Sequence, residues 1–93
     1  MKYEIGDYVI TLEQGVDVDG LTLIKSRIVD KNPYTKQYHL DDLWGCMVEY
    51  DEMITDAEKN VILSEERILG KVPKNFTPKQ LRKKFPEYFI WKE

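Results

Sequence analysis

The sequence predicts a mainly β protein, in which a small, bent, five-stranded antiparallel barrel is followed by one C-terminal helix. Apolar and polar residues mostly alternate up to residue 72, which is the period of strands, and the spacing then changes to that of a helix. A flat sheet of five such short strands would leave one face uncovered, so we expect the sheet to bend strongly. The 93 residues fit a single domain, 1–93. We expect the barrel in residues 1–72 and the helix with an aromatic tail in residues 73–93.

Five segments carry the alternating pattern and are expected to be the strands. In order, they are residues 6–14, 21–30, 36–43, 44–50 and 60–64. In the third segment the pattern places Tyr38 and Leu40 inward, and in the fourth it places Trp44 and Cys46 inward. The Asn-Pro sequence in residues 30–35 predicts a turn, and residues 55–60 predict either a loop or a single helical turn.

Residues 15–20, "GVDVDG", contain two aspartates and two glycines. The pattern is partly that of a calcium-binding loop, but the opening aspartate and the closing glutamate of such a loop are absent. Aspartate and glycine also tolerate the backbone conformations that turns require. We therefore expect a turn here and no metal site.

The start of the C-terminal helix is well marked. Thr77 is the expected N-cap, Pro78 the first helical residue, and Gln80 completes a capping box. Leu81 and Phe85 are four residues apart and share one helical face, so we expect them, together with Phe89, to cover one open end of the barrel.

The opening residues "EIGDYVITL" contain a Gly-Asp-aromatic-Val strand at Gly6–Ile10 and resemble SH3-like small barrels. The strand layout of residues 3–72 is similar to theirs. Proteins of this class bind peptides, methylated tails or nucleic acid, and a few inhibit other proteins, but no site residue can be carried over from the shared motif. The short, acidic, aromatic-rich composition also resembles that of small accessory proteins of bacteriophages and prophages.

Charge is unevenly distributed. Residues 1–66 carry 15 acidic and 6 basic side chains, a net charge of −9, whereas residues 67–93 carry 2 acidic and 8 basic ones, a net charge of +6. This asymmetry indicates either a charged partner or a tail that docks on its own acidic body.

An acidic cluster lies between residues 41 and 58, and methionines that the pattern places outward accompany it. A hairpin would gather these side chains into one patch for a basic, nucleic-acid-binding partner, such as a host or defence protein inhibited by a phage product. The alternative is a solvated face that keeps the protein soluble. The predicted partner-binding residues are Asp41, Asp42, Glu49, Asp51, Glu52, Met47 and Met53.

The basic tail supports a second function, the binding of nucleic acid. Basic residues interleaved with aromatic ones suit phosphate contacts and base stacking. The structural alternative is that these residues are the exposed face of the predicted helix, and the sequence pI of about 5.2 also opposes binding to a polyanion. The residues concerned are Lys79, Arg82, Lys83, Lys84 and Trp91.

No pattern in the sequence indicates catalysis, so we expect a protein that is not an enzyme and that holds no cofactor and no metal. Cys46 and His39 are the only cysteine and histidine, and the alternation places the thiol in the core and the imidazole outside. No apolar run reaches the roughly 18 residues of a membrane span. The N-terminus lacks the layout of a signal peptide, so we expect a cytoplasmic protein. The oligomeric state stays open, because an edge strand at residues 61–64 offers unpaired backbone groups.

Overall fold

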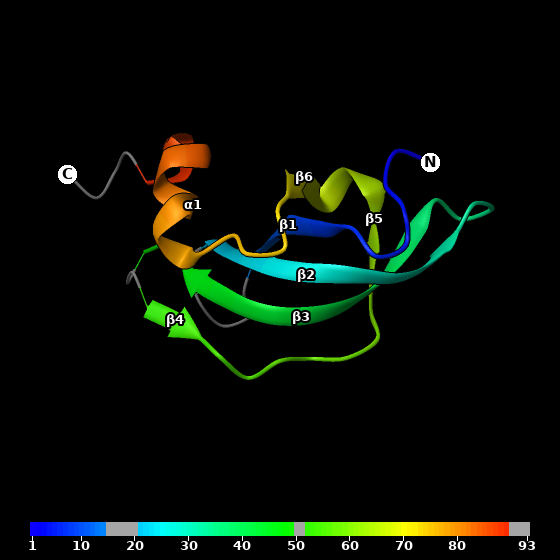
Figure 1. Cartoon of the computed structure of the whole chain (residues 1–93), viewed down its shortest axis with the longest axis horizontal. Coiled ribbons are helices and arrows are strands. Elements are labelled where there is room, and N and C mark those ends of the chain that lie inside the picture. The colour runs from blue at the N-terminus through cyan, green and yellow to red at the C-terminus, as the bar shows by residue number, and fades with distance from the viewer. Residues whose placement is uncertain (15–20, 50–51, 90–93) are drawn as a thin grey trace.

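The computed structural model describes residues 1–14, 21–49 and 52–89, and in these ranges the protein is mainly β, as predicted (Figure 1). One antiparallel sheet contains six strands, one more than predicted. In the part of the chain that the structure describes, one short helix, α1 (Pro78–Lys84), follows the sheet. One 3-10 turn, η1 (Glu65–Arg67), lies between the last two strands, and another, η2 (Pro86–Tyr88), follows the helix. The strands are β1 (Tyr8–Gln14), β2 (Leu21–Asn32), β3 (Gln37–Met47), β4 (Glu52–Ile54), β5 (Val61–Ser64) and β6 (Ile68–Val72).

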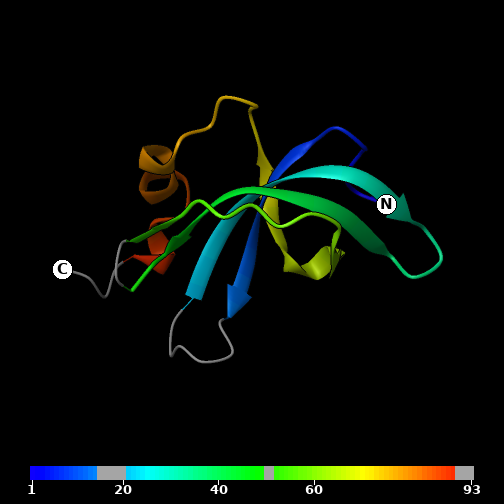
Figure 2. The same cartoon turned by 90° about the horizontal axis from the view of Figure 1, so that it is seen from below.

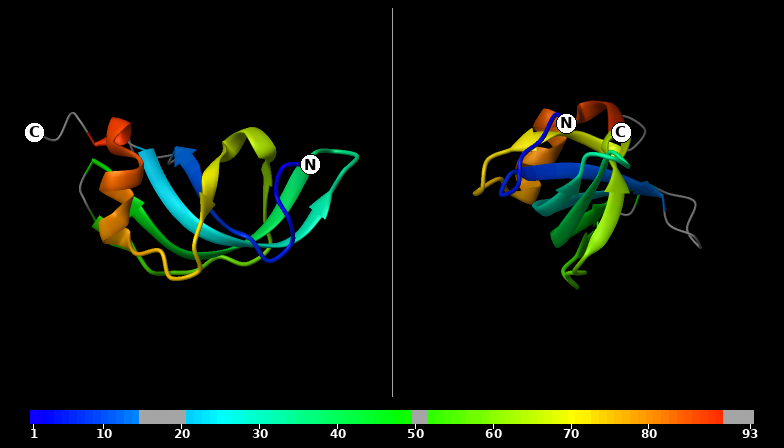
Figure 3. Two further views of the ribbon diagram at one scale, coloured as in Figure 1. Left: turned by 45° about the horizontal axis from the view of Figure 1, so that its top comes forward. Right: turned by 90° about the vertical axis from the view of Figure 1, so that its right-hand side faces the viewer.

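The strands lie in the order β4-β3-β2-β1-β6, and β5 pairs with the other half of β3. The sheet is not closed among the described residues, so the bent barrel that the sequence predicts is not confirmed and stays a prediction. Figures 2 and 3 show how strongly β2 and β3 bend along their length. Val9 and Ile10 are neighbours in β1, so their side chains point to opposite faces of the sheet, and both are fully buried. Both faces are therefore covered by other residues at this point, although the sheet does not close.

The third and fourth predicted strands are one continuous strand, β3, interrupted by a bulge. Lys25 lies opposite Trp44 and Ser26 lies opposite Asp42, which leaves Leu43 as the extra residue. An extra residue reverses the side to which the following side chains point. Apolar residues alternate without a break from residue 38 to residue 48, but those before the bulge and those after it point to opposite faces of the sheet.

Two hydrophobic cores result, one on each face of the sheet. On the first, which we call the helix face, Ile10 and Leu23 pack with Cys46 and with residues of the C-terminal segment. On the second, which we call the opposite face, Val9 and Leu40 pack beneath β5, η1 and the N-terminal segment. This second core comprises Tyr3, Val9, Ile28, Tyr38, Leu40 and Ile68, with Val61 and Leu63 against it.

The helix begins where the sequence predicts. The backbone N–H of Thr77 donates to Gln80 Oε1 at 2.8 Å, and Pro86 follows the last turn, where it disfavours further helix. Leu81, Phe85 and Phe89 are all buried, as expected, but against a face of the open sheet rather than over the end of a barrel. Figures 1 and 3 show α1 at one end of the sheet and the N-terminus at the other.

The connections and the two additional strands account for the remaining differences. The turn at residues 33–36 is confirmed, and Asn32 Oδ1 accepts the backbone N–H of Tyr34 at 3.0 Å. Residues 55–60 form no helical turn. The pattern missed β4, which has only three residues, and β6, in which Gly70 interrupts the alternation. The predicted turn at residues 15–20 lies outside the described residues.

Candidate functional site: an acidic cavity

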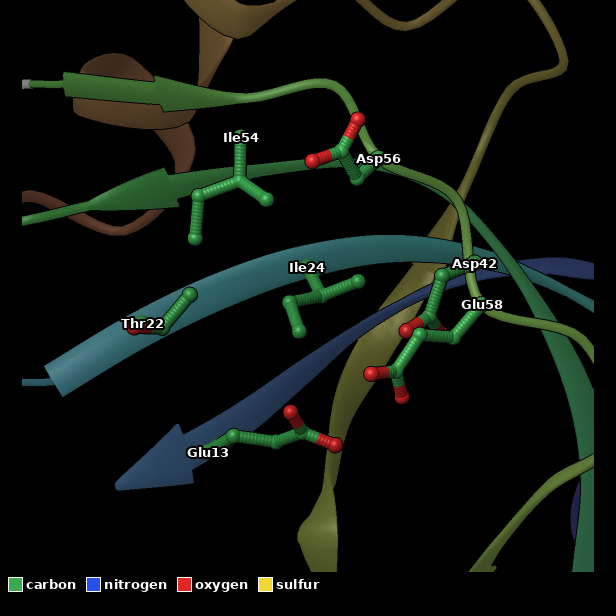
Figure 4. A pocket seen from close by; sticks show the side chains of 7 residues that line it. All are labelled: Glu13, Thr22, Ile24, Asp42, Ile54, Asp56 and Glu58. Carbon is green, nitrogen blue, oxygen red and sulfur yellow. The ribbon is translucent and has the colours of Figure 1, made fainter. Parts of the chain in front are cut away.

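A cavity of about 180 Å³ lies on the opposite face of the sheet, beyond the end of its hydrophobic core. Its walls contain four carboxyl groups and, among the residues that line it, no basic side chain. Figure 4 shows the carboxylates of Asp42 and Glu58 beside each other, with that of Glu13 directed toward them from across the cavity. The lining residues are Glu13, Thr22, Ile24, Asp42, Ile54, Asp56 and Glu58.

Strand register brings these residues together. Glu13 on β1 lies opposite Thr22 on β2, and Ile24 lies opposite Gly45 of β3. Gly45 in turn lies opposite Ile54 of β4. A Cβ at Gly45 would lie 3.2 Å from Cγ1 of Ile24, so a larger residue there would push the isoleucine out of place. The glycine therefore allows the two isoleucines to form the apolar floor of the cavity.

The acidic side of the cavity is held in place by the connection at residues 55–60. The backbone N–H of Asp42 donates to the carbonyl of Glu58 at 2.8 Å, which fixes this connection alongside β3. The backbone N–H of Asn60 donates to Asp41 Oδ1 at 3.1 Å. The adjacent aspartates of β3 thus anchor the segment that carries Asp56 and Glu58.

Two carboxyl groups of the cavity, those of Glu13 and Asp42, are partly removed from water and are affected by neighbouring negative charges. Asp42 is only 7% exposed, and the hydroxyl of Ser26 donates to its Oδ1 at 2.8 Å. Burial raises the pKa of Asp42 despite this hydrogen bond, and the charges of Glu58 and Asp41 raise it further. Burial likewise raises the pKa of Glu13, and Asp42 and Glu58 add to that increase. A cation in the cavity would therefore stabilise the ionised carboxylates.

The predicted acidic patch is divided between the two faces of the sheet. Asp42 lines the cavity, but Asp41, as its neighbour in an extended strand, points to the helix face, where its Oδ2 lies 3.8 Å from Nζ of Lys59. The patch is therefore not the single surface that the clustering in sequence suggested.

The other predicted partner-binding residues lie around the cavity end of the sheet. Met47 is half-buried and lies opposite both Thr22 and the exposed Glu52, which places it on the face of the cavity. Met53 is exposed but lies opposite Cys46 on the helix face. One carboxylate oxygen of Glu49 is buried and has no hydrogen-bond partner in the structure as described. Asp51 lies outside the described residues.

Glu13 was not among the predicted site residues. It lies far from residues 41–58 in the sequence, so a search for local clusters of charge misses it. The alternation did place Glu13 on the side of β1 away from Ile10 and Leu12, but the sequence does not show which strand would lie next to β1.

The predicted nucleic-acid-binding side chains on α1 are exposed: Lys79, Arg82, Lys83 and Lys84. The guanidinium of Arg82 lies 4.8 Å from the ring centre of Phe89. These residues lie on the helix face, away from the acidic cavity, and the helix is held to the sheet by its apolar residues. The C-terminal segment thus docks on the body of the protein, through apolar contacts on the helix face and not through the acidic cavity. Trp91 lies outside the described residues.

Cys46 and His39 are well separated. Cys46 is buried in the core of the helix face, and His39 lies in the other half of the same strand, opposite Ile62 of β5. At roughly 3.3 Å per residue, their backbones are about 20 Å apart, too far for a nucleophile and its base.

In the described ranges, no three acidic, cysteine or histidine side chains are placed to hold a metal ion. None of the helices described has the length and hydropathy needed to cross a bilayer.

No family model matches this chain, and neither a curated protein nor a solved structure is significantly similar to it. The resemblance to SH3-like barrels therefore stays a prediction, and the function is argued from the site alone.

Proposed function

We propose that this protein is a non-enzymatic interaction module that binds a basic protein partner by taking a lysine or arginine side chain into the acidic cavity. One observation carries the proposal: four carboxyl groups from three separate parts of the chain line a single cavity, and none of the described residues that line it is basic. A solvated acidic face would not need an apolar floor, whereas a site for a long cationic side chain does.

The chemistry of the cavity suits such a side chain. Lysine and arginine combine an apolar stem with a charged end. Ile24 and Ile54 offer contacts to the stem, while Asp42 and Glu58 offer acceptors to the charged end. Charge-assisted hydrogen bonds are about twice as strong as neutral ones, and a cation would also lower the raised pKa of Asp42 and of Glu13. Binding is therefore expected to release protons and to weaken as the pH falls.

The rest of the partner would contact the surface beside the cavity. Met47 and Glu52 lie on the same face, next to Thr22. A flexible methionine offers adaptable apolar contact, and Glu52 extends the negative potential. A basic, nucleic-acid-binding protein of a host cell or of a defence system fits this surface. That partner follows from the phage-like composition, and it is part of the proposal together with cytoplasmic localisation.

The experiment measures binding of a fluorescent hexa-arginine peptide by anisotropy at pH 7 and moderate salt. The double variant Glu13→Gln/Asp42→Asn removes two charges from the cavity. The matched control, Glu66→Gln/Glu87→Gln, removes the same number from exposed positions elsewhere. We expect the cavity variant to lose affinity at least about tenfold, roughly 1.4 kcal/mol, and the control to lose less than about threefold. Equal losses in the two variants would show that only net charge matters and would contradict the proposal.

The exposure of the basic side chains on α1 favours nucleic-acid binding as a second candidate function. Its test is the binding of a labelled single-stranded oligonucleotide at low and then moderate salt. Salt-sensitive binding that is lost in a Lys79/Arg82/Lys83/Lys84→Gln variant would make α1 the functional surface. Retained binding in that variant would exclude α1.

A further inference from the structure

A second cavity, of about 410 Å³, lies on the helix face and has the opposite charge. Three of the residues that line it are basic and one is acidic. They come from five parts of the chain: β1, β2, β3, the connection between β4 and β5, and the segment between β6 and α1. The lining residues are Tyr8, Arg27, Asp41, Leu43, Lys59 and Lys74.

Strand register builds the floor of this basic cavity. Arg27 on β2 lies directly opposite Tyr8 on one side and Asp41 on the other. Leu43 is the bulge residue of β3. The cavity lies beside this bulge. Lys59, in the connection between β4 and β5, and Lys74, in the segment between β6 and α1, also line it.

The single carboxylate of the cavity is already engaged. Oδ1 of Asp41 accepts the backbone N–H of Asn60 at 3.1 Å, and its Oδ2 lies 3.8 Å from Nζ of Lys59. Among the described residues, neither Arg27 nor the ammonium of Lys74 forms an ion pair. Two cationic groups therefore face this cavity without a carboxylate partner.

A buried lysine adds to the positive potential. Lys25 is 3% exposed, and its Nζ lies 5.3 Å from the ring centre of Tyr8. Its ammonium donates to the backbone carbonyls of Lys74 and Phe76, not to a carboxylate. Its charge is thus solvated by the protein backbone but is not neutralised.

We propose that the basic cavity binds a phosphate group, with Arg27 donating to two of its oxygens and with Lys59 and Lys74 supplying positive charge. The planar guanidinium matches the geometry of phosphate, and lysine acts as a point charge beside it. Tyr8 presents an aromatic ring next to the charges, which is the combination that favours a phosphate attached to a base. The site is independent of the acidic cavity, and it differs from the exposed charges of α1.

The test is a nuclear magnetic resonance titration of the ¹⁵N-labelled protein, with inorganic pyrophosphate in one arm and an eight-residue oligothymidylate in the other. The variant is Arg27→Gln/Lys74→Gln, and the matched control is Lys2→Gln/Lys36→Gln, which removes two charges from exposed positions outside both the basic cavity and α1. All four positions are exposed, so the variants should fold; unchanged spectra outside the substituted positions establish this.

We expect amide shifts near Tyr8, Arg27, Lys59 and Lys74, with at least tenfold weaker binding in the cavity variant and little change in the control. Binding in both arms indicates that the phosphate group suffices, and binding only of the oligothymidylate indicates a nucleic-acid backbone. The proposal is overturned by shifts confined to residues 78–84, by an equal loss in the two variants, or by no shifts in either arm.

Discussion

The two faces of the sheet are formed by the same strands but are covered by different parts of the chain. On the helix face, Phe76, Leu81 and Phe85 cover the apolar residues of β1, β2 and β3. On the opposite face, Tyr3 of the N-terminal segment and Val61 and Leu63 of β5 pack with the hydrophobic core, and the acidic cavity lies beyond the end of that core. The comparison teaches that placing the C-terminal segment on one face leaves charged residues of the other face free to bind a partner.

Asp41 and Asp42 show the same contrast at the scale of two residues. Asp42 lies in the acidic cavity and accepts a hydrogen bond from Ser26. Asp41 lies in the basic cavity and pairs with Lys59. Adjacent residues of a strand point to opposite faces, so two identical side chains take different roles.

The largest expected effect is a loss of stability when an apolar contact between α1 and the sheet is removed. Leu81 is 1% exposed, and Leu81→Ala should lower the free energy of unfolding by about 2–5 kcal/mol, through lost burial and the cavity left behind. Urea denaturation measures it. Lys83→Ala, on the exposed side of α1, should change stability by no more than about 0.5 kcal/mol. A similar small effect for Leu81→Ala would mean that α1 is not docked.

A smaller loss of stability is expected from Lys25→Met. Methionine keeps much of the apolar volume but leaves the carbonyls of Lys74 and Phe76 without their donor, at a cost of about 1–3 kcal/mol. Urea denaturation measures the loss, and Trp44 fluorescence should report it too, because its ring is stacked on that of Phe76 at 6.5 Å. Lys83→Met is the control. An unchanged or higher stability for Lys25→Met would show that desolvation of the ammonium outweighs its hydrogen bonds.

The smallest effect is a gain in stability and concerns the acidic cavity. The folded protein holds a proton on Asp42 at a higher pH than the unfolded chain does, so the ionised form destabilises the fold near neutral pH and protonation relieves this as the pH falls. Asp42→Asn keeps an acceptor for Ser26 and should raise the melting temperature at pH 7. The difference from the unaltered protein should shrink as the pH falls toward about 4, the ordinary range of carboxyl groups.

Melting curves at several pH values, with Glu66→Gln as the control, measure this difference. A variant that is less stable at pH 7, or a difference that does not change with pH, would argue against repulsion in the cavity. A gain in stability together with weaker binding of hexa-arginine would show that the cavity sacrifices stability for binding.

The sequence by itself determined the local structure of most elements. Alternation located β1, β2, β3 and β5, and the order Thr77, Pro78 and Gln80 marked the start of the helix, because such signals depend on residues close together in the chain. It also indicated that residues 41–58 are strongly acidic. These features follow from residue type and spacing and need no knowledge of the fold.

Only the tertiary structure decided which residues share a surface. The bulge at Leu43 turns Trp44 and Cys46 away from the face of Tyr38 and Leu40, although the alternation in sequence is unbroken. Whether a strand accepts an extra residue depends on the register of its neighbours, which is a property of the whole sheet. The same register places Glu13 on the face of Asp42, whereas the alternation of side chains along β3 separates Asp42 from Asp41. Long-range pairing, which local spacing does not encode, therefore made both cavities.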